Sequence, residues 1–180
     1  MRGGLFIGSI GAAANREELI RLGITHVLSL GTTEVHSRTG VVSDLSLSHL
    51  KVNVEDKAES DLAAEFYQCF DFIDQALGHG SSALTADALV GPDQPECQGT
   101  FPSEGQQGRV LVHCFQGKSR SAAVICAYLM RREGLSFADA LGAVRAVRPQ
   151  ACPNLGFAAQ LRRCERLGFQ HRSGNPSDPG

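Results

Sequence analysis

The sequence lacks any apolar run approaching the roughly 20 residues that a membrane-crossing helix needs. Its first residues also lack the long apolar stretch of a secretory signal, so we expect a cytoplasmic or nuclear protein without a membrane partner. Apolar residues make up 42% and charged residues 20% of the 180 positions. That balance is typical of one ordinary globular domain, with enough chain for a sizeable core.

Patterns that bind metal are absent as well. Six cysteines are present, but no CxxC pair and no cluster of Cys and His has the spacing of a zinc site. We therefore expect no metal and no cofactor. Most of the cysteines lie inside apolar patterns of a chain that has no evident secretory signal, which favours reduced thiols over a disulfide framework.

The net charge of −2 argues against a nucleic-acid partner. The charge is unevenly distributed, since residues 1–100 hold six basic and 14 acidic side chains whereas residues 101–180 hold 11 and five. A basic C-terminal part is compatible with an anionic substrate there. It is equally compatible with solvated helix faces rich in arginine.

Strand patterns alternate with helix patterns along the chain, which predicts an α/β domain over residues 1–170 with a central sheet packed by helices. We expect strands at 5–8, 25–30, 49–54 and 109–113, and helices at 15–22, 61–77, 121–132, 136–147 and 154–167. Residues 31–46 carry no clear pattern. Residues 78–108 are rich in Gly, Ser, Pro and Gln and predict a long inserted loop, and residues 171–180 predict a disordered tail.

The segment VLVHCFQGKSRSAAV carries the chemistry. A buried strand delivers Cys114 to a turn that contains Gly117, and a helix begins near Arg120. Such a strand–loop–helix directs backbone N–H groups toward one point and forms an anion site. The residues expected to bind phosphate are Phe115, Gln116, Gly117, Lys118, Ser119 and Arg120, the last through a planar fork that holds two oxygens.

A cysteine at the base of an anion site is ionised more easily than a free thiol, with a pKa of about 3.5 to 7.5 in comparable settings. We therefore expect Cys114 to attack phosphorus and form a phosphocysteine, which water then hydrolyses. Ser121 is placed to donate a hydrogen bond to the thiolate. Cys126 and Arg132 repeat the Cys-to-Arg spacing inside an apolar helix without a glycine, and we interpret that match as structural.

HCFQGKSRS followed by AYLM resembles the signature of the dual-specificity protein phosphatases. GLFIGS, GITHVLSL, DFIDQAL and RPQACPNLGF are similar to other landmarks of that family, and the resemblance covers most of residues 4–168. Lys118 and the stretch CFDFIDQA resemble plant and green-algal members. The resemblance implies a mixed sheet flanked by helices and hydrolysis of phosphotyrosine, phosphoserine and phosphothreonine.

The resemblance also implies a general acid, an aspartate in a loop before the long helix. Asp56 fits once an insertion of roughly 26 residues is removed from the loop at 78–108. Glu55 is the alternative acid, and Asp61 is expected to cap the helix.

By the same resemblance His113 tunes the pKa of Cys114 and Asn154 braces the loop. The residues alone predict a strand-end histidine and a helix cap. Arg148 could meet a second phosphate, or could simply favour a helix dipole. Cys69 could pair with an oxidised Cys114, although its helical spacing favours a place in the core.

The resemblance leaves three functions open. The first is a phosphatase that acts on a phosphorylated partner protein, with a mitogen-activated protein kinase as the natural guess. The second is a phosphatase of glucans, inositol lipids or RNA 5′ ends. The third is a phosphoprotein-binding module without catalysis, against which the presence of Cys114, Arg120 and Asp56 argues.

Overall fold

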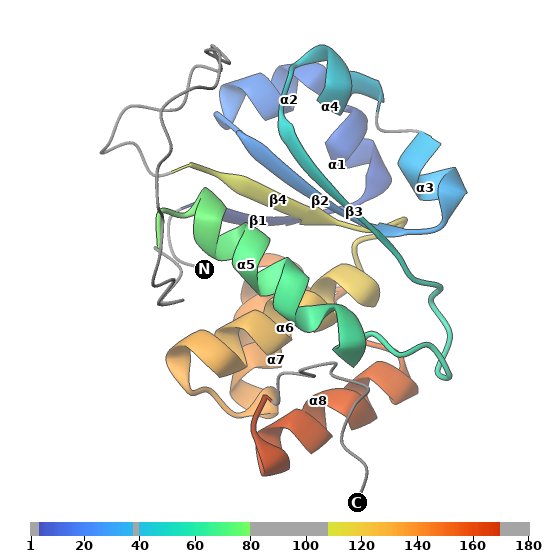
Figure 1. The fold of residues 1–180 in the computed structure, drawn as a ribbon, viewed down its shortest axis with the longest axis vertical. Helices are drawn as coiled ribbons and strands as arrows, with labels where there is room; N and C mark the ends of the chain where they lie inside the picture. Colours follow the sequence, from blue (N-terminus) through green and yellow to red (C-terminus); the bar gives the residue numbers. More distant parts are fainter. Residues whose placement is uncertain (1–3, 38–39, 80–107, 170–180) are drawn as a thin grey trace, which may run out of the picture.

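The computed structural model describes residues 4–37, 40–79 and 108–169 (Figure 1). Four strands form one sheet in the order β1-β4-β2-β3. Their bounds are β1 Leu5–Gly8, β2 His26–Gly31, β3 Ser48–Asn53 and β4 Val110–His113. The two central strands, β4 and β2, are buried almost throughout, which explains their nearly continuous apolar sequences.

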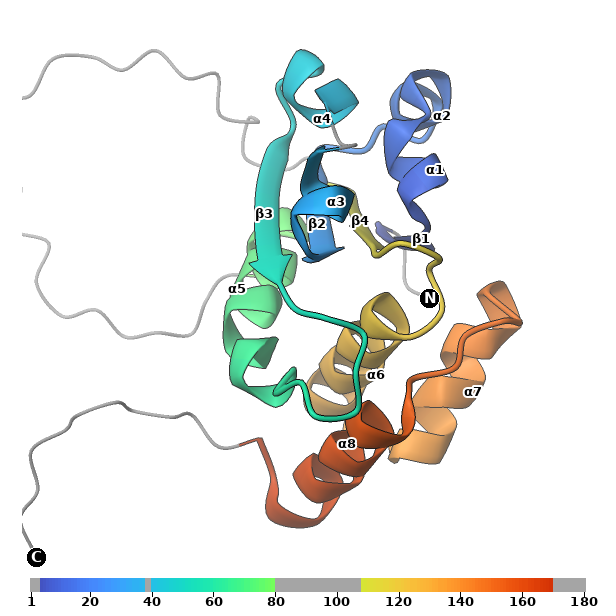
Figure 2. The ribbon, with the colours of Figure 1, turned by 90° about the vertical axis from the view of Figure 1, so that its right-hand side faces the viewer.

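Helices cover both faces of the sheet, as Figure 1 and the view turned by 90° in Figure 2 show. The first group comprises α1 Ile10–Ala14, α2 Arg16–Arg21, α3 Thr33–Ser37 and α4 Gly40–Asp44. The second group comprises the 3₁₀ turn η1 Ala63–Glu65, α5 Phe66–Ala76, α6 Arg120–Glu133, α7 Phe137–Val147 and α8 Leu155–Leu167.

The period of two along each strand divides the interior into two hydrophobic clusters. Leu28 and Val112 face the larger cluster, which α5, α6, α7 and α8 complete. Val27 and Leu111 face the smaller one beneath α1, α2 and α4. Helix α6 lies inside the larger cluster and is buried at every position from Arg120 to Met130. Among the described residues no helix combines the length and apolar character needed to cross a membrane.

Three of the predicted helix starts are confirmed by side-chain caps. The side chains of Asn15, Ser136 and Asn154 each accept a hydrogen bond from the backbone N–H three residues later, at 3.1, 3.1 and 2.9 Å. These contacts satisfy N–H groups that have no partner within the helix. The α/β class is confirmed by this arrangement of strands and helices.

Several details differ from the prediction. All three described strand pairs are parallel, whereas the resemblance implied a mixed sheet. The described helices between successive strands fit this, because parallel neighbours need a crossover that returns the chain to the same end of the sheet. The unplaced residues 31–46 contain α3 and α4, and α1 was not expected. The predicted helix at 61–77 begins later, with η1, whose Ala64 N–H donates to Asp61 Oδ1 at 3.2 Å.

Two predicted segments lie outside the described residues. Of the loop predicted at 78–108, residues 80–107 are not described, and Cys97 is among them. The tail predicted at 171–180 is not described either. Both assignments remain predictions.

A close contact links α8 to the loop that precedes η1. A Cβ atom added to Gly156, in the first turn of α8, would overlap the backbone of Ala58. The loop therefore lies against α8 at a distance that only glycine permits. Gln160 adds two hydrogen bonds of 2.8 Å: its Oε1 accepts from the Ala63 N–H, and its Nε2 donates to the carbonyl of Ser60.

We predict that Gly156→Ala lowers the free energy of unfolding by about 1–3 kcal/mol, because the added methyl group forces α8 and the loop apart. Urea denaturation measures the change. Gly142→Ala is the matched control: a Cβ on this α7 glycine meets nothing within 4 Å, so the helix should gain about 0.4–1 kcal/mol. Equal effects of the two substitutions would contradict the contact.

Candidate active site

Strand β4 ends at His113 and delivers Cys114, which is 1% exposed, to the base of a loop. The loop closes where α6 begins at Arg120. Gly117 occupies the left-handed region with φ of +69°, and a Cβ there would overlap the backbone of Gly8. Glycine is therefore required both by the backbone conformation and by the packing against β1.

The loop carbonyls point outward, because neighbouring segments supply a donor to each of four successive ones. The Ile10 N–H donates to Phe115 O at 3.1 Å, Arg148 donates to Gln116 O at 2.8 Å and to Gly117 O at 3.3 Å, and the Cys152 N–H donates to Lys118 O at 2.7 Å. A peptide unit whose carbonyl points outward directs its N–H the other way. The loop thereby forms a concave set of amide donors of the kind that binds anions.

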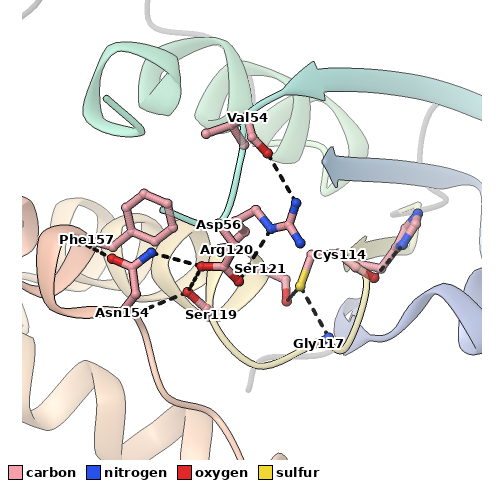
Figure 3. A network of polar contacts seen from close by, with 10 residues as sticks. Val54, Asp56, Cys114, Gly117, Ser119, Arg120, Ser121, Asn154 and Phe157 are labelled. Atoms are coloured by element: carbon pink, nitrogen blue, oxygen red, sulfur yellow. Dashed lines mark hydrogen bonds and ion pairs between the residues drawn. The ribbon is translucent and has the colours of Figure 1, made fainter. Parts of the chain in front are cut away.

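The thiol of Cys114 lies at the base of this loop, as Figure 3 shows. The Gly117 N–H donates to Cys114 Sγ at 3.2 Å, and the Ser121 hydroxyl lies 3.4 Å from the same sulfur. The N-terminus of the 14-residue α6 begins at Arg120 and adds the positive end of a helix dipole.

Opposing effects act on the pKa of Cys114. Burial on its own would raise it. Hydrogen bonds from the hydroxyl and amide of Ser121, the charge of Arg120 and the amide of Lys118 outweigh burial and hold the pKa below the ordinary thiol value. The other buried thiols behave in the opposite way, because burial raises the pKa of Cys69 and brings that of Cys126 to about 12. Among the described thiols whose pKa is shifted, only that of Cys114 is lowered, which is the condition a nucleophilic thiol needs.

Arg120 extends over the loop from the start of α6. Its Nη1 donates to the carbonyl of Val54 at 3.2 Å, and its Nε lies 3.6 Å from Asp56 Oδ2. That Nε is buried and makes no hydrogen bond to any described residue. A buried donor without an acceptor is costly, so an oxyanion bound in the loop would supply what the guanidinium lacks.

Asp56 is brought to the same site from the loop after β3. Its Oδ1 accepts from Ser119 Oγ at 2.6 Å and from Asn154 Nδ2 at 2.9 Å (Figure 3). Its neighbour Glu55 instead forms an exposed ion pair of 2.6 Å with Lys57. Of the two carboxylates considered from the sequence, the structure places Asp56 beside Arg120 and engages Glu55 elsewhere.

The two residues that the resemblance assigned a supporting role, His113 and Asn154, both contact the loop that begins at Cys114. His113 is completely buried, with Nδ1 3.3 Å from the carbonyl oxygen of Cys114 and Nε2 2.6 Å from Ser29 Oγ. Asn154 caps α8 and also contacts the loop, since its N–H donates to Ser119 Oγ at 3.1 Å. Among the loop residues, Phe115, Gln116 and Lys118 are exposed and Ser119 is buried.

Sequence reasoning missed the residues that hold the loop from outside, namely Ile10, Val54 and Ser29. For Arg148 it considered a second phosphate or a helix dipole, whereas the side chain fixes two loop carbonyls. These roles leave no local motif, because each partner is far from the loop in the sequence. The sequence shows an arginine at position 148, but it does not indicate that this side chain donates to the carbonyls of Gln116 and Gly117.

In the described parts of the chain, no group of three or more His, Cys, Asp or Glu side chains could hold a metal ion. A cavity of about 260 Å³ lies between the η1–α5 region and α8, with Tyr67, Gln160 and Cys164 among its lining residues. Its lining includes Asp61, which was expected to cap the helix, and none of the predicted site residues.

A thiolate at the base of an amide-lined loop, with an arginine and a carboxylate above it, is the arrangement of a cysteine-based phosphatase. Residues 102–167 match the model of the dual specificity phosphatase catalytic domain. Dual specificity protein phosphatase 1B of Arabidopsis thaliana is 37% identical over 163 residues, which span 91% of this chain and 78% of that protein. Human dual specificity protein phosphatase 13B is 34% identical over 167 residues, which span 91% of this chain and 71% of that protein.

Solved structures agree. A mouse putative dual specificity phosphatase complexed with zinc tungstate is 33% identical, with a TM-score of 0.66 over 90% of this chain and 82% of that one. Human DUSP28 is 31% identical, with a TM-score of 0.66 over 91% of this chain and 92% of that one. The chain belongs to the dual specificity phosphatase family, and its enzyme class is that of the dual-specificity protein phosphatases.

We predict that alkylation of Cys114 by iodoacetamide reaches half its plateau rate at a pH below the ~8.5 of a free thiol, because only the thiolate reacts. Ser121→Ala should move that midpoint to higher pH, since it removes a hydrogen bond that favours the thiolate. Mass spectrometry of the Cys114 peptide measures the rate, with the exposed Cys152 as internal reference. A midpoint that Ser121→Ala leaves in place would contradict the assigned cause.

Proposed function

We propose that the chain hydrolyses phosphorylated side chains of partner proteins through a phosphocysteine intermediate on Cys114. One observation carries this proposal: four outward-facing loop carbonyls leave the amides directed at the anion that Cys114 would attack. The phosphoryl group would be held by these amides and by the guanidinium of Arg120, which can bind two of its oxygens.

In the first step the Cys114 thiolate attacks phosphorus, and the bond from phosphorus to the side-chain oxygen breaks. Asp56 gives its proton to the departing oxygen, so that a neutral alcohol or phenol leaves. In the free protein Asp56 lies 3.6 Å from Arg120 Nε. A bound phosphate dianion takes over as the partner of that guanidinium, and the carboxyl group is then available to hold a proton.

In the second step water attacks the phosphorus of the phosphocysteine, and the Asp56 carboxylate accepts a proton from that water. The sulfur–phosphorus bond breaks and its electron pair returns to Cys114. The Ser121 hydroxyl, 3.4 Å from the sulfur, and the Gly117 N–H stabilise the thiolate that leaves. Inorganic phosphate is released, and the free enzyme is restored.

A phosphorylated protein is the substrate class that the relatives' names and the loop support best. Lys118 is the only cation of the loop besides Arg120, which gives little attraction for a multiply phosphorylated lipid headgroup. A mitogen-activated protein kinase is the partner that the family resemblance suggests, and we propose that the protein meets such partners in the cytoplasm or nucleus.

The direct test compares wild type with Cys114→Ser on phosphotyrosine and phosphothreonine peptides, in the presence of a metal chelator. We expect the wild type to release phosphate from both peptides and Cys114→Ser to release none, because a serine hydroxyl is not ionised at neutral pH. Activity retained by Cys114→Ser would contradict the mechanism. Peptide binding without release by reduced, folded wild type would identify a binding module instead.

We predict that Asp56→Asn lowers kcat by roughly 10²- to 10⁴-fold on phosphopeptides while KM changes little, since the proton donor is lost and the phosphate loop stays intact. Glu55→Gln is the matched control and should stay near wild type, because Glu55 pairs with exposed Lys57 outside the site. Steady-state kinetics measures both. The reverse pattern would assign the general acid to Glu55.

A further inference from the structure

A chain of three polar side chains lies behind the catalytic loop, on the sheet face that α1, α2 and α4 cover. Ser29 of β2 and His113 of β4 are partners in register, and His49 lies on the neighbouring strand β3. Ser29 Oγ is 2.6 Å from His113 Nε2 and 2.7 Å from His49 Nε2. Ser29 and His113 are completely buried, whereas His49 is partly exposed at the edge strand of the sheet.

The hydrogen positions in this chain follow from what each atom can do. The carbonyl of Cys114 can only accept, so its contact with His113 Nδ1 at 3.3 Å requires a proton on that nitrogen. In neutral His113 the Nε2 is then an acceptor, and the single hydroxyl proton of Ser29 is donated to it. Ser29 Oγ accepts in turn, and the donor is His49 Nε2.

We propose that His49 is a positioning residue for phosphoryl transfer, which acts through Ser29 to fix the tautomer and orientation of His113, the histidine that holds the carbonyl of Cys114. The inference rests on the proposed function of Cys114 and extends it to two residues outside the loop. His49 does not touch the reacting atoms. It determines instead where the peptide that carries the nucleophile lies.

The reason lies in burial. An imidazole nitrogen in a fully enclosed position needs a partner, because the loss of a hydrogen bond there is not compensated by water. Without a donor at His49, the Ser29 hydroxyl can turn away from His113, and the ring is free to adopt its other tautomer. His113 Nδ1 would then lose its proton, and with it the contact to the Cys114 carbonyl.

The test replaces His49 with an apolar and with a conservative side chain. We expect His49→Leu to lower kcat on an aryl phosphate roughly tenfold, as the loss of one hydrogen bond implies, with little change in KM. The same substitution should move the pH midpoint of Cys114 alkylation upward. His49→Gln should keep both the kcat and the alkylation midpoint close to the wild-type values, since its amide can still donate to Ser29 Oγ.

His26→Leu is the matched control. His26 lies on β2, is also partly buried, and also contacts a hydroxyl, with Nδ1 2.8 Å from Thr25 Oγ1, at the opposite end of the strand from the Ser29–His113 contact. The charged residues of β3 and of helices α3 and α4, which pack on β2 and β3, are Lys51, Glu34 and Asp44, and they stay unchanged in every variant. Equal effects of His49→Leu and His26→Leu, or an unchanged alkylation midpoint in His49→Leu, would overturn the proposal.

Imidazole nitrogen shifts of the wild type test the proposal without any substitution, should His49→Leu fail to fold. We expect a proton on Nδ1 of His113 and on Nε2 of His49 near neutral pH, and a His113 Nδ1 without a proton would overturn the assignment. The alkylation and the shifts do not depend on phosphatase activity. A wild type that is inactive on aryl phosphate would therefore contradict the proposed function. The alkylation and the nitrogen shifts would still decide whether His49 fixes the tautomer of His113 through Ser29.

Discussion

The site depends on one constraint, which is that four successive loop carbonyls after Cys114 are held on the outside of the loop. Their donors come from α1, from the end of α7 and from the connection between α7 and α8, so three parts of the chain must be in place before the amides converge. A loop that turned even one of these carbonyls inward would present an acceptor to an anion. The proposed binding site for phosphate therefore depends on the whole fold.

The connection between α7 and α8 contacts both the loop that begins at Cys114 and the side chain of Asp56. Cys152 fixes the loop that carries the nucleophile, while Asn154 contacts Ser119 of that loop and also Asp56. Immediately beyond, Gly156 lets α8 lie against the loop that carries Asp56, and Gln160 fastens the end of that loop. The loop that carries Cys114 and the loop that carries Asp56 are thus both held by one connection, although Asp56 lies 58 positions before Cys114 in the sequence.

Site residues and helix caps could be predicted from the sequence where the residues that form the pattern lie close together in the chain. Cys114, Gly117, Arg120 and Ser121 lie within eight residues, and the helix caps at Asn15, Ser136 and Asn154 are equally local patterns, so all of them could be placed by spacing. Strands β1, β2 and β4 were found from short apolar runs, and β3 from the alternation of apolar and polar residues along it. Short helices such as α1, α3 and α4 hold five residues each, too few for a helical period to be visible.

What could not be predicted depends on contacts between distant segments. Nothing near Ile10 or Arg148 indicates a loop carbonyl as its partner, and the chain from Cys114 through His113 and Ser29 to His49 crosses three strands whose order only the fold defines. The parallel direction of every described strand pair was missed for a related reason, because the resemblance was used in place of the crossover argument that the helices between strands supply.

The central claim is that Cys114 carries the phosphoryl group during turnover, and trapping that intermediate tests it most directly. Asp56→Asn protein, mixed with an aryl phosphate whose leaving group needs no proton, should complete the first step and stall at the second, where Asp56 accepts the proton of water. After a quench in denaturant at alkaline pH, where the sulfur–phosphorus bond survives, mass spectrometry should find one phosphoryl group on the peptide that contains Cys114. A quench that finds no phosphoryl group on Cys114, while wild type hydrolyses the same aryl phosphate, would contradict the account.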